Sequence, residues 1–131
     1  MTDEAHNDIV RLRLLHSDEF LRGAHCLTTT ASWGGVVSFL YYASFHAVMG
    51  LLKQSGVSVK SHSSAIKLFH TQYVKTGLIS DNYGKFYIRL HRERDRRDYE
   101  DFAVFTADEV LPLVPQTEEF IDVIKRLITT Y

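Results

Sequence analysis

The chain has 131 residues, the length of one domain and enough to bury a hydrophobic core. Its 15 Lys and Arg residues nearly balance 16 Asp and Glu residues, so no global field attracts nucleic acid and any RNA contact must come from a local patch. The lone Cys26 excludes an internal disulfide, and no apolar run reaches the roughly 20 residues that span a bilayer. We therefore expect a single domain over residues 1–131 that is cytoplasmic and has no contact with a membrane.

The N-terminal half of the chain predicts two helices. Apolar residues recur at helical spacing over residues 8–27, and the β-branched run 28–30 is a poor helix former that predicts a connection. The second helix is predicted over residues 33–54, with Ser32 as its cap and Gly56 just beyond its end. Because this helix is apolar nearly all round, we expect it to be the most buried element.

Two further helices are predicted in the middle of the chain. The third covers residues 62–76, where Ser61 can cap its start. Gly77 is placed to end it in a left-handed conformation, followed by an apolar contact from Leu78. The fourth helix is predicted from residue 80 or 81 to residue 97.

The last helical region contains two prolines. Thr106 and Glu109 have the spacing of a capping box. Pro112 and Pro115 cannot both lie in an undisturbed helix interior, so a turn or kink is predicted before a firm helix over residues 116–129. Since no segment alternates with a two-residue period, the predicted fold is all-α, an up-and-down bundle of four or five helices.

One side of the fourth helix carries an arginine among apolar residues. Turning the helix by 100° per residue places Arg94 on the aromatic side, and burying an unpaired charge is costly. Asp98, four residues on, is the local candidate for a partner. The pair is either a structural clamp, or Arg94 projects into a cleft and binds a phosphate with its planar guanidinium. The other members of the aromatic side are Tyr83, Phe86, Tyr87 and Leu90.

The opposite side of the fourth helix is basic. Four cationic residues fall within one narrow stripe with no acidic residue interleaved at helical spacing. Such a stripe is either a solvated helix face or a surface for RNA or an acidic partner. The stripe consists of Lys85, Arg89, Arg92 and Arg96.

The histidines suggest no metal site. On the second helix, Tyr42 and His46 form a polar seam, which is either a buried hydrogen-bonded pair or a way for His46 to face Arg94 as an acid–base group. His62 opens the third helix, where its ring either faces a ligand or assists capping. The other five histidines lack metal-ligand spacing, so no metal and no cofactor are expected.

Three motifs together carry a family resemblance. They are Tyr-Tyr-Ala-Ser-Phe-His-Ala at residues 41–47, His-Ser-Ser-Ala at residues 62–65, and Arg-x-x-x-Asp-Tyr-Glu-Asp-Phe at residues 94–102. Their order and spacing resemble the HEPN family of small helical proteins, in particular its stand-alone branch, from about residue 33 to the C-terminus. The resemblance implies a link with RNA cleavage and with toxin–antitoxin pairs, in which the partner is a minimal nucleotidyltransferase.

The resemblance also limits the catalytic prediction. RNA-cleaving HEPN proteins carry an arginine followed four to six residues later by a histidine, and here Arg94 matches but Tyr99 replaces the histidine. Tyrosine, with a pKa near 10, is a poor base at neutral pH. We therefore expect weak or no ribonuclease activity and a phosphate site built on Arg94, Asp98 and Tyr99. The alternatives are a metal-independent endoribonuclease assisted by His46 or Tyr99, and an RNA- or nucleotide-binding bundle without catalysis.

A homodimer is the last expectation. The resemblance implies a seam that brings two Arg94 sites together, and aromatic residues with arginine are enriched in interface cores. The aromatic side of the fourth helix would supply this seam in a two-fold dimer. The alternative is that these aromatic residues fill the core of the monomer.

Overall fold

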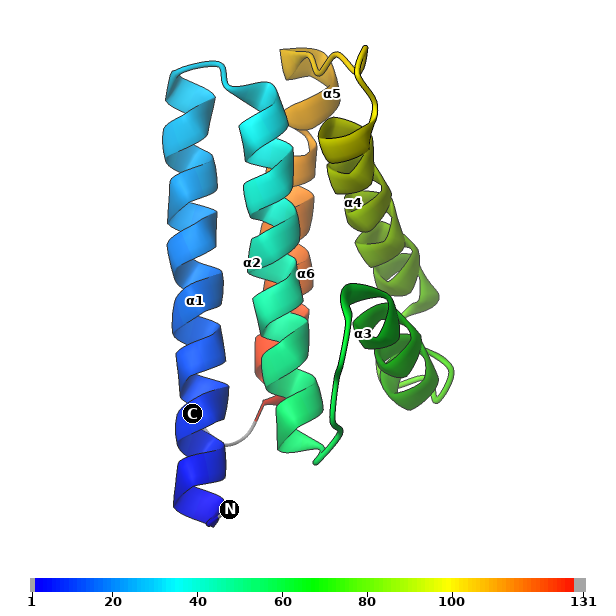
Figure 1. Ribbon diagram of the computed structural model, residues 1–131. Coiled ribbons are helices and arrows are strands. Elements are labelled where there is room, and N and C mark those ends of the chain that lie inside the picture. The colour runs from blue at the N-terminus through cyan, green and yellow to red at the C-terminus, as the bar shows by residue number, and fades with distance from the viewer. Residues whose placement is uncertain (1, 129–131) are drawn as a thin grey trace.

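The periodic apolar pattern produces helices throughout residues 2–128, the part of the chain that the structure, a computed structural model, describes. This part contains no strand, and it has five helices of eight or more residues with one single-turn helix, which confirms the predicted all-α bundle (Figure 1). The elements are α1 (Asp3–Thr29), α2 (Trp33–Gln54), α3 (His62–Phe69), the π-helical segment η1 (His70–Val74), α4 (Asp81–Tyr99), α5 (Ala107–Val110) and α6 (Leu113–Leu127).

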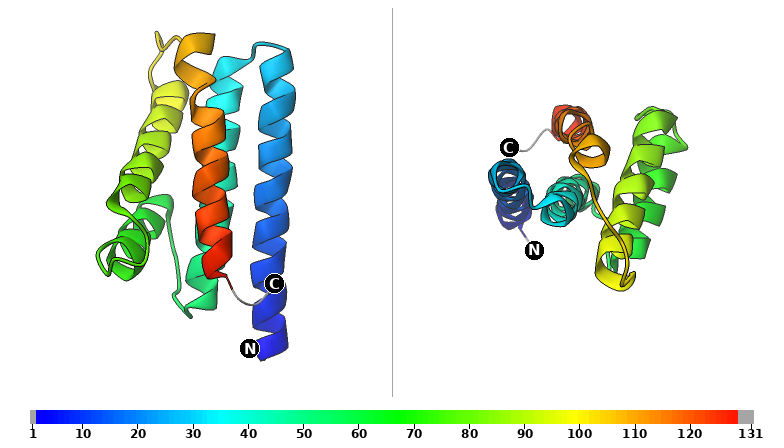
Figure 2. Two further views of the ribbon diagram at one scale, coloured as in Figure 1. Left: turned by 180° about the vertical axis from the view of Figure 1, so that it is seen from behind. Right: turned by 90° about the horizontal axis from the view of Figure 1, so that it is seen from above.

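The four long helices alternate in direction around α2. Helix α2 contacts α1, α3, α4, α5 and α6, so it is the central element of the bundle. Seen from behind, α6 covers one side of α2, with α1 and α4 on either side of it (Figure 2). The short α3 packs against α2 and α4 and is inclined to the long helices (Figure 1). This inclination brings the start of α3 over the middle of α2.

Helix α2 is the most buried element, as its all-round apolar sequence predicts. Twelve of its 22 residues are buried, and Leu40, Tyr41 and Leu51 are fully enclosed. By length and composition α2 could cross a membrane, but 67% of its most apolar 18-residue window is buried inside the bundle. This burial is what the core helix of a globular domain shows.

The first helix is longer than predicted at its start. It begins at Asp3 because the Thr2 hydroxyl caps it, accepting a hydrogen bond from the Ala5 N–H at 3.1 Å. It also continues through Thr28, whose hydroxyl donates to the His25 carbonyl at 2.6 Å. Ser32 is the N-cap residue of α2 as predicted, but its hydroxyl bonds the Thr30 hydroxyl and makes no capping hydrogen bond within residues 2–128.

The helical segment after residue 61 starts as the sequence predicts, but its middle has a conformation that the sequence did not predict. Ser61 caps α3 as predicted, in a reciprocal capping box with Ser64. After Phe69 the helix widens into the π-helical η1, which the apolar pattern does not indicate. Gly77 has the predicted left-handed conformation, with φ of 83°. The predicted apolar contact from Leu78 is wrong: Leu78 is exposed.

Its neighbour makes that contact instead. The Ile79 N–H donates to the Tyr73 carbonyl at 2.9 Å, which turns the Ile79 side chain into the core. At the other end of the chain, Thr106 accepts the predicted capping bond from the Glu109 N–H at 3.3 Å. Helix α6 begins at Leu113, before the predicted start, because Pro115 lies in its first turn, where the missing N–H has no cost. The predicted last helical residue, 129, lies outside the described residues.

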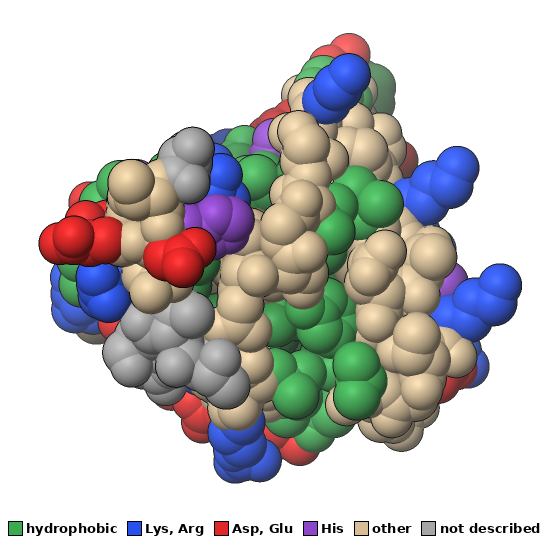
Figure 3. Space-filling model, turned by 90° about the horizontal axis from the view of Figure 1, so that it is seen from below, with side chains coloured by type: hydrophobic (Ala, Val, Ile, Leu, Met, Phe, Trp, Pro, Cys, Tyr) green, Lys and Arg blue, Asp and Glu red, His purple; other side chains and the backbone are tan. Residues whose placement is uncertain are grey.

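The surface of the described residues is mixed in charge. Figure 3, a view from below, shows Lys and Arg side chains projecting at the rim of this end, with acidic side chains among them and hydrophobic side chains gathered between. This mixture agrees with the net charge of −1. A ligand with many charges would therefore be recognised by a local site and not by the whole surface.

Candidate functional site

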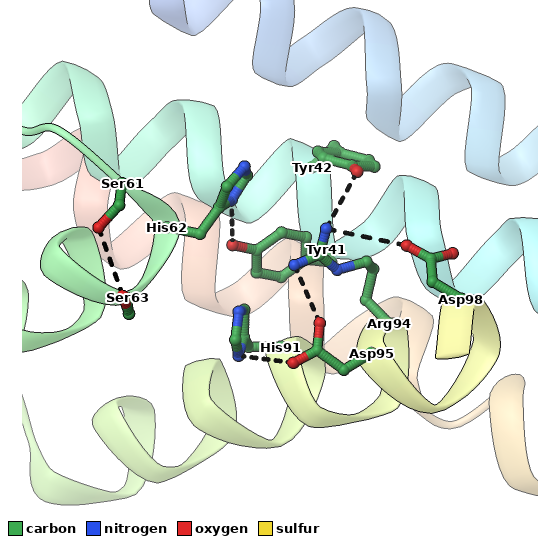
Figure 4. A network of polar contacts seen from close by, with 9 residues as sticks. All are labelled: Tyr41, Tyr42, Ser61, His62, Ser63, His91, Arg94, Asp95 and Asp98. Carbon is green, nitrogen blue, oxygen red and sulfur yellow. Dashed lines mark hydrogen bonds and ion pairs between the residues drawn. The ribbon is translucent and has the colours of Figure 1, made fainter. Parts of the chain in front are cut away.

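The guanidinium group of Arg94 lies between α4 and α2. Helical phase points Tyr87, Leu90 and Arg94 inward from α4, and the Arg94 side chain is only 11% exposed. Its guanidinium carbon lies 4.9 Å from the ring centroid of Tyr41 and 5.8 Å from that of Tyr42, both on α2 (Figure 4). Contact with aromatic rings is a favourable way to hold a desolvated cation.

Three oxygen atoms surround this guanidinium group. Nη1 donates to the Tyr42 hydroxyl at 3.3 Å and lies 3.8 Å from Asp98 Oδ2, while Nη2 lies 3.0 Å from Asp95 Oδ1. The predicted reach between Arg94 and Asp98 is therefore present, but Asp95 is the closer carboxylate. Sequence reasoning missed Asp95, because adjacent residues diverge by 100° on a helix and only a long side chain curling back brings them together.

Two histidines complete the cluster, and both meet the ring of Tyr41. His62, at the start of α3, has its Nδ1 2.7 Å from the Tyr41 hydroxyl, and its ring stacks on Phe45 with centroids 4.3 Å apart. His91, one turn before Arg94, has its ring centroid 5.4 Å from that of Tyr41, and its Nδ1 lies 3.7 Å from Asp95 Oδ2. Figure 4 shows both rings near the hydroxyl end of Tyr41.

The sequence held a signal for one of these histidines. His91 and Arg94 are three residues apart on one helix and therefore share a face, a relationship that helical phase alone reveals. The position of His62 depends on how α3 docks on α2, which no local pattern specifies. The only hint of its role was the motif at residues 62–65.

Both imidazoles are held in the neutral form. Burial lowers the pKa of His62, and the positive charge of Arg94 lowers it further, with Asp95 acting in the opposite direction. Burial likewise lowers the pKa of His91, against the raising effect of Asp95. At neutral pH each ring therefore offers one N–H donor and one acceptor nitrogen.

The charge state of the centre of the cluster is well defined. Burial raises the pKa of Tyr41 to about 12, so its phenol stays protonated at its hydrogen bond with His62 Nδ1. Burial alone would lower the pKa of Arg94, but the Tyr42 hydrogen bond and Asp95 outweigh it and raise that pKa. The Arg94 Nε atom is enclosed by the bundle and has no hydrogen-bond partner among residues 2–128.

His46 lies elsewhere in the bundle. It faces α1, where its Nδ1 is 3.0 Å from Arg13 Nη1 and its ring stacks on Phe20 with centroids 5.5 Å apart. Burial and the charge of Arg13 lower the pKa of His46 to about 4. The structure therefore does not bring His46 to Arg94, and it supports the structural interpretation of the polar seam on α2.

At the C-terminal end of α4, the residues that follow Arg94 in the motif point away from the core. Asp98 is shared, because its Oδ1 lies 3.6 Å from Arg97 Nη1 while Oδ2 faces Arg94. Tyr99 is the last residue of α4 and is 77% exposed, so its hydroxyl is free to solvent. Arg94 and Asp98 thus form one cluster with Tyr42, whereas Tyr99 lies on the surface beside it.

The basic stripe of α4 is partly neutralised. Lys85 pairs with Asp81 one turn earlier at 3.1 Å. Arg96 lies 3.2 Å from Glu93 and 3.8 Å from Glu109, and its guanidinium covers the Phe105 ring at 4.1 Å. The premise that no acidic residue interleaves is wrong, because Glu93 is on the same turn and Glu109 arrives from α5.

The remaining members of the stripe are open to solvent. Arg89 and Arg92 are exposed, and Arg89 borders a hollow of about 330 Å³ between α2, α4 and α5. The structure therefore places only these two of the four cations where a phosphate could reach them without breaking an ion pair. Both lie on the side of α4 away from Arg94.

The aromatic side of α4 faces the core of the monomer. Tyr87 and Leu90 are fully buried, and Tyr87 stacks on Phe120 of α6 with centroids 5.6 Å apart. Phe86 and Tyr83 pack on the same ring, at 6.0 Å and 6.4 Å. These residues already have partners within the chain, so they offer no support for a dimer seam.

The described residues hold no group of three or more His, Cys, Asp or Glu side chains placed to bind a metal ion. Taken together, the observations define a small helical bundle in which the nearly buried Arg94 contacts two tyrosines and two carboxylates, and two histidines lie against one of those tyrosines.

Comparison with known proteins gives this bundle a family. The HEPN domain model matches residues 10–127, so the chain belongs to the HEPN family. It is 34% identical over 110 residues to a Thermotoga maritima protein named "UPF0332 protein", covering 84% of this chain and 83% of that relative. Two Methanocaldococcus jannaschii relatives, named "Putative toxin MJ0605" and "Putative toxin MJ0142", are 29% and 22% identical over 84% of this chain, and the matches cover 81% and 75% of their own lengths.

Proposed function

We propose that this protein is the HEPN component of a toxin–antitoxin or defence-type system, acts with a minimal nucleotidyltransferase partner, and binds a phosphate of RNA or of a nucleotide through Arg94. The toxin names of two relatives and the family membership support the system. A compact intracellular component of this kind works in the cytoplasm.

The observation that carries the phosphate proposal is the state of the Arg94 guanidinium. It is 11% exposed, and the rings of Tyr41 and Tyr42 orient it. A planar cation held in one orientation loses little entropy when it forms bidentate hydrogen bonds to a phosphate. Asp95 and Asp98 balance Arg94 and Arg97, so the net charge offered to the phosphate is set by His62 and His91.

The alternative function is an endoribonuclease. Its usual histidine is replaced by Tyr99, but the structure places His62 and His91 on the ring that carries Arg94. Imidazoles are the most common proton-transfer groups in enzymes. This arrangement, and not Tyr99 or His46, is what favours catalysis.

A homodimer also remains part of the proposal, with a seam other than the aromatic side of α4. Multi-angle light scattering at micromolar concentrations measures the oligomeric state. A monomer at all concentrations would remove the dimer from the proposal and leave the phosphate site unaffected.

Binding to a fluorescent single-stranded RNA and to a fluorescent nucleotide tests the phosphate proposal by anisotropy. Arg94→Ala is expected to weaken binding by at least about tenfold, as the loss of a charge-assisted bidentate contact implies. Arg22→Ala is the matched control, since Arg22 is an exposed arginine on α1. Equal affinity of the wild type and the folded Arg94→Ala variant would contradict the proposal.

A further inference from the structure

We infer that the molecule has a second anion site, which binds a small phosphate monoester carrying an apolar substituent. The site is a hollow of about 200 Å³ between the N-terminal half of α1, the last turns of α2 and residues 57–59, in the connection that leads from α2 to α3 (Figure 1). Within the described part of the chain, no residue of α3 or α4 lines this hollow. The inference is therefore independent of the proposed phosphate contact of Arg94.

Two cations line this hollow, and no carboxylate balances them. Arg13 on α1 and Lys53 on α2 are both partly buried, and in the described part of the chain neither forms an ion pair. The guanidinium of Arg13 instead bonds Nδ1 of His46, an uncharged acceptor, at 3.0 Å. Asp8, the carboxylate next to the hollow in sequence, is paired with Arg11. Two partly desolvated charges of one sign in one hollow favour the binding of an anion.

Helix dipoles do not explain both of these cations. Lys53 lies in the last turn of α2, where a cation is favourable, but Arg13 lies in the interior of α1. The carbonyl groups at the end of α2, which would repel an anion, are already bonded, because those of residues 51–53 accept hydrogen bonds from the N–H groups of residues 55–57. Burial and then the charge of Arg13 lower the pKa of His46 to about 4, as expected where no anion screens that charge.

The rest of the lining is apolar apart from one hydroxyl group. The Ser58 hydroxyl has no hydrogen-bond partner in the described part of the chain and can donate to a ligand. Because sites for drug-sized ligands measure about 300–1,000 Å³, this hollow suits a smaller molecule with an anionic group and a short apolar body. The apolar side chains are partly buried and belong to Ile9, Met49, Val57 and Val59.

The number of cations favours one class of anion. A phosphate monoester carries a charge of about −1.5 to −2 at pH 7 and offers three acceptor oxygens, which match Arg13, Lys53 and Ser58. A planar guanidinium can also bind two phosphate oxygens at once. A carboxylate has a single charge and balances only one of the two cations. The hollow therefore fits a phosphate monoester better than a carboxylate.

The test follows ligand binding at individual residues. The ¹⁵N-labelled full chain is titrated in phosphate-free buffer with butyl phosphate, inorganic phosphate, pentanoate and 1-butanol, and two-dimensional NMR records the amide signals. Signals of residues 57–59 report on this hollow, and signals of residues 91–98 report on the Arg94 cluster. The variants are Arg13→Gln, Lys53→Gln and the matched control Lys67→Gln, which removes an exposed cation from α3.

The folded state of each variant is verified by circular dichroism. Glutamine at position 13 can still donate a hydrogen bond to His46. If Arg13→Gln nevertheless does not fold, Lys53→Gln tests the inference alone, because Lys53 lies near the end of its helix.

Butyl phosphate is expected to shift the signals of residues 57–59 to saturation. Inorganic phosphate should bind at least about fivefold more weakly, since it buries no methylene groups, and pentanoate should also bind more weakly because it has one charge. The neutral 1-butanol should not saturate. Arg13→Gln and Lys53→Gln should each weaken butyl phosphate binding by at least about tenfold, and Lys67→Gln by less than about twofold.

Several results would overturn the inference. Butyl phosphate that leaves the signals of residues 57–59 unchanged, or shifts only those of residues 91–98, would show that the hollow is not a phosphate site. Equal affinity in the folded Arg13→Gln and Lys53→Gln variants would exclude the two cations as ligands. Pentanoate that binds as tightly as butyl phosphate would exclude the preference for a phosphate, and inorganic phosphate that does so would exclude the apolar substituent.

Discussion

Arg94 and Tyr41 form a contact between a nearly buried guanidinium and a fully buried phenol, with 4.9 Å between the guanidinium carbon and the ring centroid. The two side chains come from α4 and α2, whose packing therefore determines the geometry of the site. Because burial raises the pKa of Tyr41 to about 12, the ring stays neutral and the cation keeps its charge for a ligand. The same phenol positions His62 through its hydroxyl.

Phosphate binding should strengthen as the pH falls. The pKa values of His62 and His91 are lowered by burial, so both rings are neutral at pH 7.5 and gain protons below their usual value of about 6.5. Each proton that these two rings gain adds positive charge that faces the ligand. Between pH 7.5 and 5.5 we expect the affinity for RNA to rise roughly threefold to tenfold, measured by anisotropy at constant salt.

The control for this dependence is the double variant His62→Gln, His91→Gln. It should bind RNA with an affinity that changes much less over the same pH range. A wild-type affinity that falls on acidification, or an equal pH effect in the double variant, would show that these two imidazoles do not set the charge of the site.

We expect some cations of the basic stripe to contribute to RNA binding and others to be neutralised by carboxylates. Arg92 is exposed, whereas Arg96 is engaged by Glu93 and Glu109. Removing Arg92 should reduce the slope of log affinity against log salt by about 0.7 to 1, the effect of one lost phosphate contact. Removing Arg96 should leave the slope unchanged and lower the free energy of unfolding by roughly 1 kcal/mol through the lost Phe105 contact.

Two results would contradict this prediction for Arg92 and Arg96. If Arg96→Ala reduces the salt slope as much as Arg92→Ala, then RNA displaces the carboxylates from Arg96 and the whole stripe acts as predicted from the sequence. If neither variant changes the slope, this side of α4 is a solvated face.

Helical phase predicted much of the site, and the limits of local patterns explain the rest. The 100° rotation per residue placed Arg94 with Tyr87 and Leu90 on the inner side of α4, where the structure has them. The contact between Arg94 and Asp98 followed from the same rule. Each of these relationships lies within one helix, where spacing in sequence determines spacing in the structure.

Contacts between residues on different helices could not be predicted from helical phase. His62 reaches Tyr41 only because α3 docks on α2, and Glu109 reaches Arg96 only because α5 folds back toward α4. Tyr87, on the aromatic side of α4, stacks on Phe120, which is distant in sequence. The π-helical η1 depends on the packing of this same region and has no signature in the apolar period.

Two phenylalanines separate core packing from surface exposure. Phe120 is fully buried against Tyr87 and Phe69, whereas Phe102 is 97% exposed. Phe120→Ala should lower the free energy of unfolding by about 3–5 kcal/mol because it leaves a cavity, and Phe102→Ala should change it by less than about 0.5 kcal/mol. Urea denaturation followed by circular dichroism measures both. A large loss for Phe102→Ala would mean that the loop after α4 is packed in solution, as in a dimer.

Acid should destabilise the bundle partly through His46. Burial, Arg13 and the neighbouring His16 lower the pKa of His46 to about 4, against about 6.5 in an unfolded chain. The folded state therefore binds fewer protons than the unfolded state between these values. The contribution of His46 to stability is complete above pH 6.5 and is lost as the pH falls toward 4.

The variant His46→Gln isolates this effect. The full shift would correspond to about 3 kcal/mol, but the ring is partly exposed and solvent screening reduces the figure to roughly 1–2 kcal/mol. Urea denaturation at pH 7.0 and 4.5 should therefore show the stability difference between wild type and His46→Gln narrowing by about this amount. His62, His91 and the carboxylates are present in both proteins, so their titration cancels in the difference. A stability difference that stays constant with pH would mean that His46 gains its proton as readily in the bundle as in the unfolded chain, with Arg13 turned away from its ring.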